Sequence, residues 1–235
     1  MTDTVSTGME TTNANPDDLI FDRELMREKD YWTGRLARLS GHADGRLPAA
    51  VPPPPTDGTG EVSGDLPEEI RQGLLALTGG NQFLIYTTLM AALKVCLYRH
   101  TGNPVVVVAS PARLNDGGDG GERQTPNVLA IVDEVGDGLT FRQFLLNVRA
   151  TLVEAYANQR YPFRLLLEDL GDDDGAQVFS TSLRLKNIHA ELPECACDLA
   201  LTFELMPAGL TWTATFDASR LRPVEVERFV ARFLN

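Results

Sequence analysis

Three histidines are the residues of this chain best suited to acid–base chemistry, and none stands in a recognisable catalytic motif. His42 falls in a stretch rich in proline and glycine, His100 near the end of an expected helix, and His189 after an expected strand. A helix C-terminus favours a protonated imidazole at His100, whereas a general base needs a partner within hydrogen-bond reach. No two histidines are adjacent. The sequence therefore predicts no catalytic residue.

The pair Cys195 and Cys197, with His189 upstream, raises the question of a zinc site. Structural zinc sites use four ligands and a Cys-x₂₋₄-Cys spacing, and this chain has no second pair. We expect two reduced thiols and no metal. Cys96 lies in an apolar helical stretch and is expected to act as a small core residue. Three cysteines give no disulfide framework, which is typical of a reducing cytoplasm.

Phosphate-binding and nucleophile motifs are absent from the sequence. There is no G-x-G-x-x-G, no Walker loop and no G-x-S-x-G elbow. The run Gly117 to Gly121 is rich in glycine but carries Asp119 where a phosphate would lie, so it indicates a flexible loop. No nucleotide cofactor is expected to bind this chain.

The charge balance excludes two classes of partner. The 235 residues hold 21 Lys and Arg against 33 Asp and Glu, a formal net charge of -12. Such a surface repels nucleic acid and anionic lipid. No uninterrupted apolar run approaches the length of a membrane span, and the first residues have no basic or apolar region typical of a signal peptide. We expect a cytoplasmic protein without nucleic-acid or membrane partners.

Composition divides the chain into four segments. Residues 1–16 are polar and are predicted to be a disordered tail. Residues 17–40 predict an N-terminal helix, since Leu25, Trp32 and Leu36 recur at helical spacing. Residues 41–60 are predicted to be a linker, because the prolines at 52–55 favour an extended polyproline conformation. Residues 61–235 are long enough to form the main domain with its own core.

The periodicity of this main domain predicts an α/β fold. The helix from Asn81 to Thr101 is apolar nearly all round, which is typical of a central, buried helix. Thr140 and Gln143 form a capping box for another helix. Including the first helix, the expected order of elements is α–β–α–α–β–β–α–α–β–β–β–α, which favours one sheet with helices on one face. The expected strands are 61–65, 105–109, 128–132, 179–185, 199–205 and 210–216.

Two short stretches are the most informative. In residues 155–163 a helix ends, Pro162 begins another, and Phe163 is expected in the core. In residues 182–187 a strand delivers Asn187 at its end, where the amide could point into a cleft. The first stretch is expected to be structural.

Together these segments resemble the C-terminal half of a nonribosomal peptide synthetase condensation domain, a family of the chloramphenicol-acetyltransferase-like fold. Asn158-Gln159-Arg160-Tyr161-Pro162-Phe163-Arg164 is similar to the family's H/N-Q-D-Y-P-F-E motif, which implies a structural role for Asn158, Gln159, Tyr161, Pro162 and Phe163. The strand ending at Asn187 resembles F-x-V-x-F-S-L-Q-N, which implies that Asn187 faces the catalytic channel. Further similar stretches are Tyr31-Trp32 with Leu36, 97–102, and 139–145.

The departures from the family are as informative as the similarities. The family's H-H-x-x-x-D-G motif lies upstream of the Tyr-Trp helix, and this sequence has no histidine there. The G-x-F-V-N-T motif is reduced to residues 124–128, and the family's aspartate is Arg160. The end at Asn235 matches the usual end of the condensation fold. We therefore expect the C-terminal lobe alone, without the lobe that holds the histidine.

The resemblance leaves three hypotheses open. In the first, the chain is a truncated, non-catalytic condensation domain that packs against an adenylation domain or docks a carrier domain. In the second, it is half of a split enzyme that forms amide bonds on carrier-tethered substrates. In the third, two copies cover each other's exposed faces as a homodimer. In each, phosphopantetheine belongs to the partner carrier protein, and no cofactor binds this chain directly.

Overall fold

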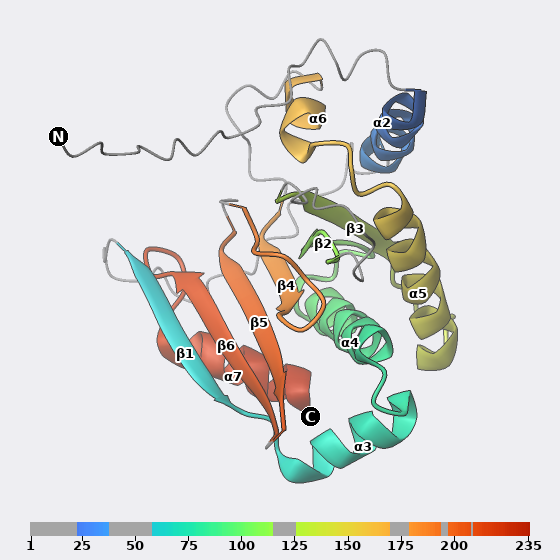
Figure 1. The fold of residues 1–235 in the computed structure, drawn as a ribbon. Helices are drawn as coiled ribbons and strands as arrows, with labels where there is room; N and C mark the ends of the chain where they lie inside the picture. The colour runs from blue at the N-terminus through green and yellow to red at the C-terminus, as the bar shows by residue number, and fades with distance from the viewer. Residues whose placement is uncertain (1–22, 38–57, 115–125, 170–178, 194–196, 208) are drawn as a thin grey trace, which may run out of the picture.

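The computed structural model contains one six-stranded mixed sheet with helices on one of its faces (Figure 1). It describes residues 23–37, 58–114, 126–169, 179–193, 197–207 and 209–235. The elements, in chain order, are α2 (Arg23–Leu36), β1 (Thr59–Asp65), α3 (Glu68–Thr78), α4 (Gln82–Thr101), β2 (Val105–Pro111), β3 (Val128–Glu134), α5 (Phe141–Ala157), α6 (Phe163–Asp169), β4 (Thr181–Leu185), β5 (Leu199–Met206), β6 (Gly209–Asp217) and α7 (Pro223–Leu234). This order confirms the prediction.

Local sequence signals set several element ends. The Oδ1 atom of Asn81 accepts the amide of Leu84 at 3.0 Å and caps the start of α4, and Gly102, with a left-handed φ of 73°, caps its end. The capping box of α5 is confirmed, because the amide of Gln143 bonds Thr140 Oγ1 at 3.3 Å and the amide of Thr140 bonds Gln143 Oε1 at 2.9 Å.

Several boundaries differ from the sequence prediction, and most strands extend one or two residues beyond a predicted end. Strand β1 begins at Thr59, two residues before the predicted start and inside the predicted linker. Strand β4 begins at Thr181 and not at Phe179, since Phe179 lies against the ring of Phe163 outside the strand. The predicted helix at Pro162 begins at Phe163. The predicted tail, most of the linker and the glycine run lie outside the described residues.

The strands are ordered β1-β6-β5-β4-β2-β3. Strand β4 is parallel to both of its neighbours, β2 and β5, and the remaining pairs are antiparallel. Gly60 and Gly64 of β1 lie opposite Phe216 and Trp212 of β6. A Cβ at Gly60 would meet the Phe216 ring, and one at Gly64 would lie 2.9 Å from the Trp212 ring. Only glycine fits beneath these rings, which fixes the register of β1.

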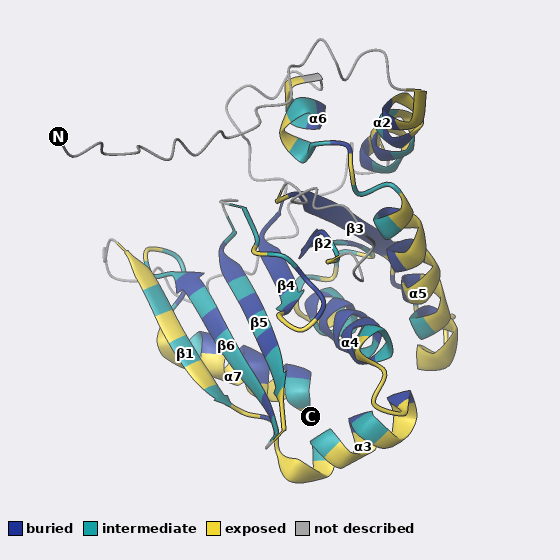
Figure 2. Cartoon of the chain, viewed as in Figure 1, coloured by how far each residue is buried: buried dark blue, intermediate teal, exposed yellow. Residues whose placement is uncertain are grey.

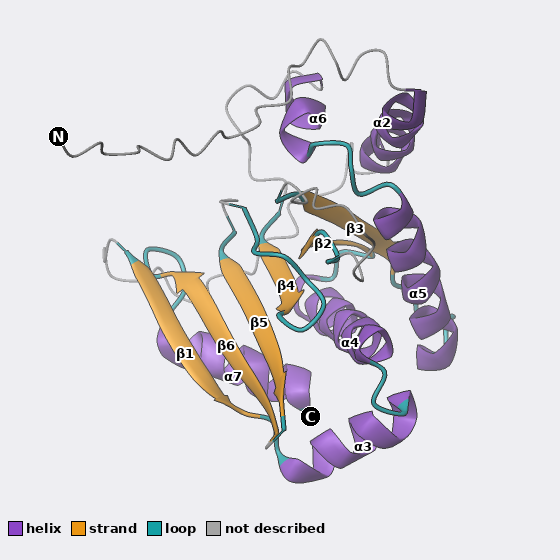
Figure 3. Ribbon diagram, in the orientation of Figure 1, coloured by secondary structure: helices purple, strands orange, loops and turns teal. Residues whose placement is uncertain are grey.

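One face of the sheet packs against helices, as the sequence predicts (Figure 3). Lys94 of α4 and Thr151 of α5 both bond Asp133 of β3, and Phe203 of β5 contacts Phe233 of α7 edge to face. The register places these strand residues on the same face. The core lies between this face and the helices, with α4 in its middle (Figure 2).

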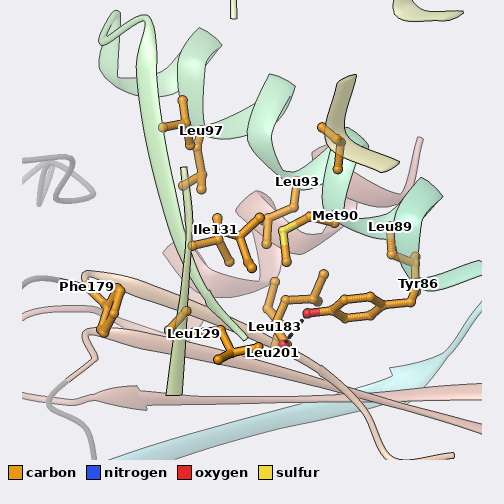
Figure 4. Close-up of a cluster of buried hydrophobic side chains, with 14 of the residues drawn as sticks. Tyr86, Leu89, Met90, Leu93, Leu97, Leu129, Ile131, Phe179, Leu183 and Leu201 are labelled. Atoms are coloured by element: carbon orange, nitrogen blue, oxygen red, sulfur yellow. Dashed lines mark hydrogen bonds between the residues drawn. The ribbon is translucent and has the colours of Figure 1, made fainter. Parts of the chain in front are cut away.

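The packing around α4 is close. Met90 and Leu93 of α4 are completely buried, as are Ile131 of β3 and Leu183 of β4. Figure 4 shows these side chains together, with the hydroxyl of Tyr86 reaching the backbone at Leu183. The predicted central role of this helix is confirmed. Cys96 is only partly buried, but it packs against the core, and burial raises the pKa of its thiol.

Candidate functional site

The candidate site lies at the edge of the sheet where the parallel strands end. Strands β2, β4 and β5 run in the same direction, so their carboxyl ends share one edge, here called the carboxyl edge. After β4 the chain turns and runs beside the end of β2, where Arg113 pairs with His189 in an isolated bridge. In open α/β sheets ligands bind outside this edge.

Residues 158–163, here called the motif loop, connect α5 to α6 beside this edge. The side chain of Gln159 pairs with the backbone of Arg113, because its Oε1 accepts the amide at 2.8 Å and its Nε2 donates to the carbonyl at 3.4 Å. The Nδ2 atom of Asn127 donates to the carbonyls of Gln159 and Tyr161 at 2.9 and 2.8 Å, and its Oδ1 accepts the amide of Phe163 at 3.0 Å. The amide side chains of Gln159 and Asn127 thus bond backbone groups that would otherwise be paired within a helix or a sheet.

Helix α2 holds the other side of the motif loop. One oxygen of Glu28, Oε2, accepts the backbone amides of Arg160 and Tyr161 at 2.8 and 2.9 Å. Trp32 donates its indole N–H to the carbonyl of Asn158 at 2.6 Å. Glu28 is buried at 6% exposure, although it stands in a charged sequence that would suggest a surface helix. Sequence reasoning missed this residue.

Arg160, which stands where the family motif has an aspartate, also contacts α2. The guanidinium of Arg160 lies 2.8 Å from Glu24 of α2, and both side chains are exposed. The ion pair joins the same two elements that Glu28 joins. The motif loop therefore connects α2 to the sheet through these contacts. That its residues have only a structural role stays a prediction.

Asn187 lies at the carboxyl edge, directly after β4. Its side chain is exposed, and its amide pairs with the backbone of Leu205: Nδ2 donates to the carbonyl at 3.0 Å and Oδ1 accepts the amide at 2.7 Å. The amide thus continues the pairing between β4 and β5 two residues beyond its last pair, Leu185 with Phe203. That Asn187 faces a catalytic channel stays a prediction.

Close to the motif loop lies a group of polar side chains, most of them buried, from three elements and the segment after β4. The Nε2 atom of His189 lies 2.7 Å from the hydroxyl of Tyr156, and its Nδ1 lies 3.1 Å from the amide nitrogen of Leu185. Tyr86 donates to Ser110 Oγ at 2.7 Å, and the rings of Tyr86 and His189 are 4.2 Å apart. These contacts connect α4, α5, β2 and the segment after β4.

Burial controls the protonation of this group. It lowers the pKa of His189 to about 3, against a smaller opposing effect of the hydrogen bond with the Leu185 backbone. Burial also raises the pKa of Tyr86 and of Tyr156. At neutral pH the imidazole and both phenols are uncharged. The Ser110 hydroxyl donates to the carbonyl of Pro111 at 3.1 Å, so its proton is not directed at the imidazole. This arrangement suits packing rather than proton transfer.

The cysteine and histidine positions give no metal cluster in the part of the chain that the structure describes. Cys195 and His42 lie outside that part, and Cys197 is partly buried. Within it, no group of three His, Cys, Asp or Glu side chains converges. Over the same residues, no helix combines the length and the hydropathy that a membrane crossing requires.

Comparison with known proteins identifies the family. The condensation domain profile matches residues 20–217. The chain belongs to the condensation-domain family. It is 27% identical to tyrocidine synthase 3 of Brevibacillus parabrevis over 187 residues, which is 71% of this chain and 3% of that synthase. The condensation fold is confirmed by this match and by the structures below.

Solved structures share the fold at lower identity. The condensation domain of the monacolin K polyketide synthase MokA matches with a TM-score of 0.74 and 16% identity, over 93% of this chain and 57% of that chain. A chain from the complex of the X-domain and OxyB of teicoplanin biosynthesis matches with a TM-score of 0.68 and 17% identity, over 90% and 51%. This condensation-domain chain thus spans about half the length of these structures.

Proposed function

We propose that this chain is the C-terminal lobe of a condensation domain and serves as a structural and docking module of a nonribosomal peptide synthetase. The observation that supports this most is coverage, since over 90% of the chain matches about half of a solved condensation domain. The sequence has no adjacent histidine pair, which is what the family's catalytic motif would require. On this proposal the lobe does not catalyse condensation by itself.

The geometry of the carboxyl edge supports a structural role. The amides of Gln159 and Asn187 both pair with backbone groups, and His189 is buried and uncharged at neutral pH. Side chains that are bonded to the backbone or buried in this way stabilise the shape of the surface. Carrier and adenylation domains of a synthetase are the proposed neighbours, with phosphopantetheine on the carrier. The solved complex of the X-domain with OxyB supports a docking role, because it is a complex between proteins in which one chain has this fold.

One observation favours the split-enzyme alternative. Asn187 is exposed at the carboxyl edge, where the family resemblance places a channel residue, so a second lobe could cover it. In that case the histidine motif would come from another polypeptide. The homodimer stays a third alternative.

The test mixes the 235-residue chain with donor-loaded and acceptor-loaded carrier proteins and measures amide product by mass spectrometry. The chain alone should give no product above the uncatalysed background. Product formed by the chain alone would rule out the non-catalytic proposal.

A second arm adds a separately expressed N-terminal lobe that carries the H-H-x-x-x-D-G motif. The docking proposal expects no product here either. Product that falls in Asn187→Ala, but not in the neighbouring control Lys186→Ala, would establish the split enzyme instead. Thermal melts of both variants would check that the fold is unchanged.

A further inference from the structure

The outward side of α5 carries an apolar stripe that faces solvent. Four of the nine large apolar side chains that are exposed in the described residues lie on α5 or in the turn before it: Leu139, Phe141, Leu146 and Val153. Leu146 is 56% exposed and Val153 is 50% exposed. In Figure 2 this side of the helix faces away from α4 and is coloured as exposed. A surface helix normally presents polar residues there, so the stripe needs an explanation.

The spacing of the stripe is that of a helix–helix contact. Leu146, Ala150, Val153 and Ala157 are exposed and follow one another at intervals of four, three and four residues. These four residues, here called the α5 stripe, lie along one line of the helix. This is the a/d pattern of a coiled-coil contact, and the alanines let a second helix approach closely. The opposite side of α5, with Val148 and Leu152, is buried in the core.

The two flanks of the α5 stripe differ in charge. Arg142 and Arg149, seven residues apart, are exposed along one flank. On the other flank, Glu154 lies 2.8 Å from Arg35 of α2. A cationic flank is notable on a chain with a formal net charge of -12. It favours a partner whose acidic residues lie beside its own apolar stripe.

A second copy of this chain fits the α5 stripe less well. An antiparallel pair of α5 helices would bring the two arginine flanks together, and like charges in contact are unfavourable. A parallel pair would direct Arg149 at Glu154 of the other copy, but that carboxylate already binds Arg35. The stripe is also short compared with the area that a stable dimer buries.

We propose that the α5 stripe docks an amphipathic helix of another protein, with acidic residues along one flank of that helix. The contact is small and charge-guided, which is typical of weak, transient interactions. The inference deepens the docking role proposed above and rests on it. It assigns the contact to one helix and to one kind of partner.

The test uses two designed peptides of about 20 residues, long enough to form helix. Both carry a leucine and alanine stripe. One has glutamate along the flank that would face Arg142 and Arg149, and the other has lysine there. Fluorescence anisotropy measures their binding to the full chain. The glutamate peptide should bind about tenfold more tightly than the lysine peptide at low salt, and the difference should shrink as salt screens it.

Variants make the assignment specific. Arg142→Glu with Arg149→Glu should reverse the preference, and Leu146→Glu should abolish binding of both peptides. Leu77→Glu is the matched control, because Leu77 is 62% exposed on α3, and it should change nothing. Equal binding of both peptides, or an unchanged preference in the reversed variant, would overturn the inference.

Self-association of the chain that Leu146→Glu abolishes would also overturn it in favour of a second copy. Light scattering at several protein concentrations measures this self-association. Since none of these measurements involves amide formation, failure here is distinguishable from failure of the non-catalytic proposal.

Discussion

His189 has an environment that a sequence pattern cannot show. It is 1% exposed, and its ring lies between Tyr86 and Tyr156. Arg113 and Arg184 add a small unfavourable field for a protonated imidazole. A histidine so placed is uncharged in the folded chain and becomes charged on unfolding in mild acid. Its effect on stability therefore has a definite sign.

We expect stability to fall as pH falls from about 6.5 to about 3. In this interval the unfolded chain binds a proton at His189 that the folded chain does not bind, since burial lowers the pKa from 6.5 to about 3. One such group gives a slope of up to about 1.4 kcal/mol per pH unit. In His189→Gln this slope should disappear. Urea denaturation between pH 7 and pH 4 measures it.

The matched control is His100→Gln, since His100 is exposed at the end of α4. Because this variant keeps the buried His189, it should keep the part of the slope that His189→Gln removes. Carboxylates also titrate over this pH range. The test therefore compares the slopes of the variants with one another and does not use the absolute slope of any one of them. Identical slopes for His189→Gln and the wild type would contradict the buried, uncharged imidazole.

At the scale of elements, one buried carboxylate, that of Glu28, makes the central polar contact between α2 and the motif loop. Glu28 satisfies two backbone amides of the motif loop, and Trp32 satisfies one of its carbonyls. Hydrogen bonds to a charged acceptor are stronger than neutral ones, and leaving buried donors without an acceptor is costly. The ion pair of Arg160 with Glu24 adds little, because both side chains are exposed.

Glu28→Ala should therefore lower the free energy of unfolding by about 2–4 kcal/mol, since two amides lose their acceptor. Glu28→Gln keeps an acceptor oxygen and should lose about half of that. Glu24→Ala should lose less than about 1 kcal/mol. Chemical denaturation measures all three, and hydrogen exchange at Arg160 and Tyr161 should accelerate only in the Glu28 variants. Equal losses for Glu24→Ala and Glu28→Ala would contradict the account.

The order and type of the elements could be predicted, because they depend on local patterns. The apolar surface of α4, the capping box at Thr140 and the alternation in β5 and β6 each act within a few residues. The partners of Glu28 and Gln159 could not be predicted in this way. Glu28 bonds residues more than 130 positions away, and Gln159 bonds a backbone 46 positions away. The family motif indicated which loop contacts α2 and the sheet, but not which residues make these contacts.

At the scale of the whole molecule, a buried ion pair joins the helices to the sheet. Lys94 of α4 is completely buried, and its Nζ lies 2.6 Å from Asp133 of β3 and 2.6 Å from the carbonyl of Ile131. Thr151 of α5 donates to the other oxygen of Asp133 at 2.6 Å. Burial lowers the pKa of Lys94, and the carboxylate of Asp133 opposes this effect. Three elements thus meet at one charge pair.

Breaking this pair should destabilise the whole fold. Lys94→Met leaves Asp133 buried without its cation and should cost about 3–5 kcal/mol. The double variant Lys94→Met with Asp133→Asn removes both charges and should cost less than the sum of the single changes. Native-state hydrogen exchange should show faster exchange throughout the core, not only near α4. Lys186→Ala, at the exposed pair with Glu204, is the control and should cost less than about 1 kcal/mol.

The order of the strands determines how late in synthesis the sheet can be completed. Among the strands that the structure describes, β1, which ends at Asp65, pairs with β6 alone, and β6 ends at Asp217. At about 5–20 residues per second, a ribosome needs on the order of ten seconds to make the residues between them. During that time α4, β2 and β3 have emerged, while half of the sheet that covers them has not been made. The nascent chain is therefore most vulnerable to aggregation before its last third appears.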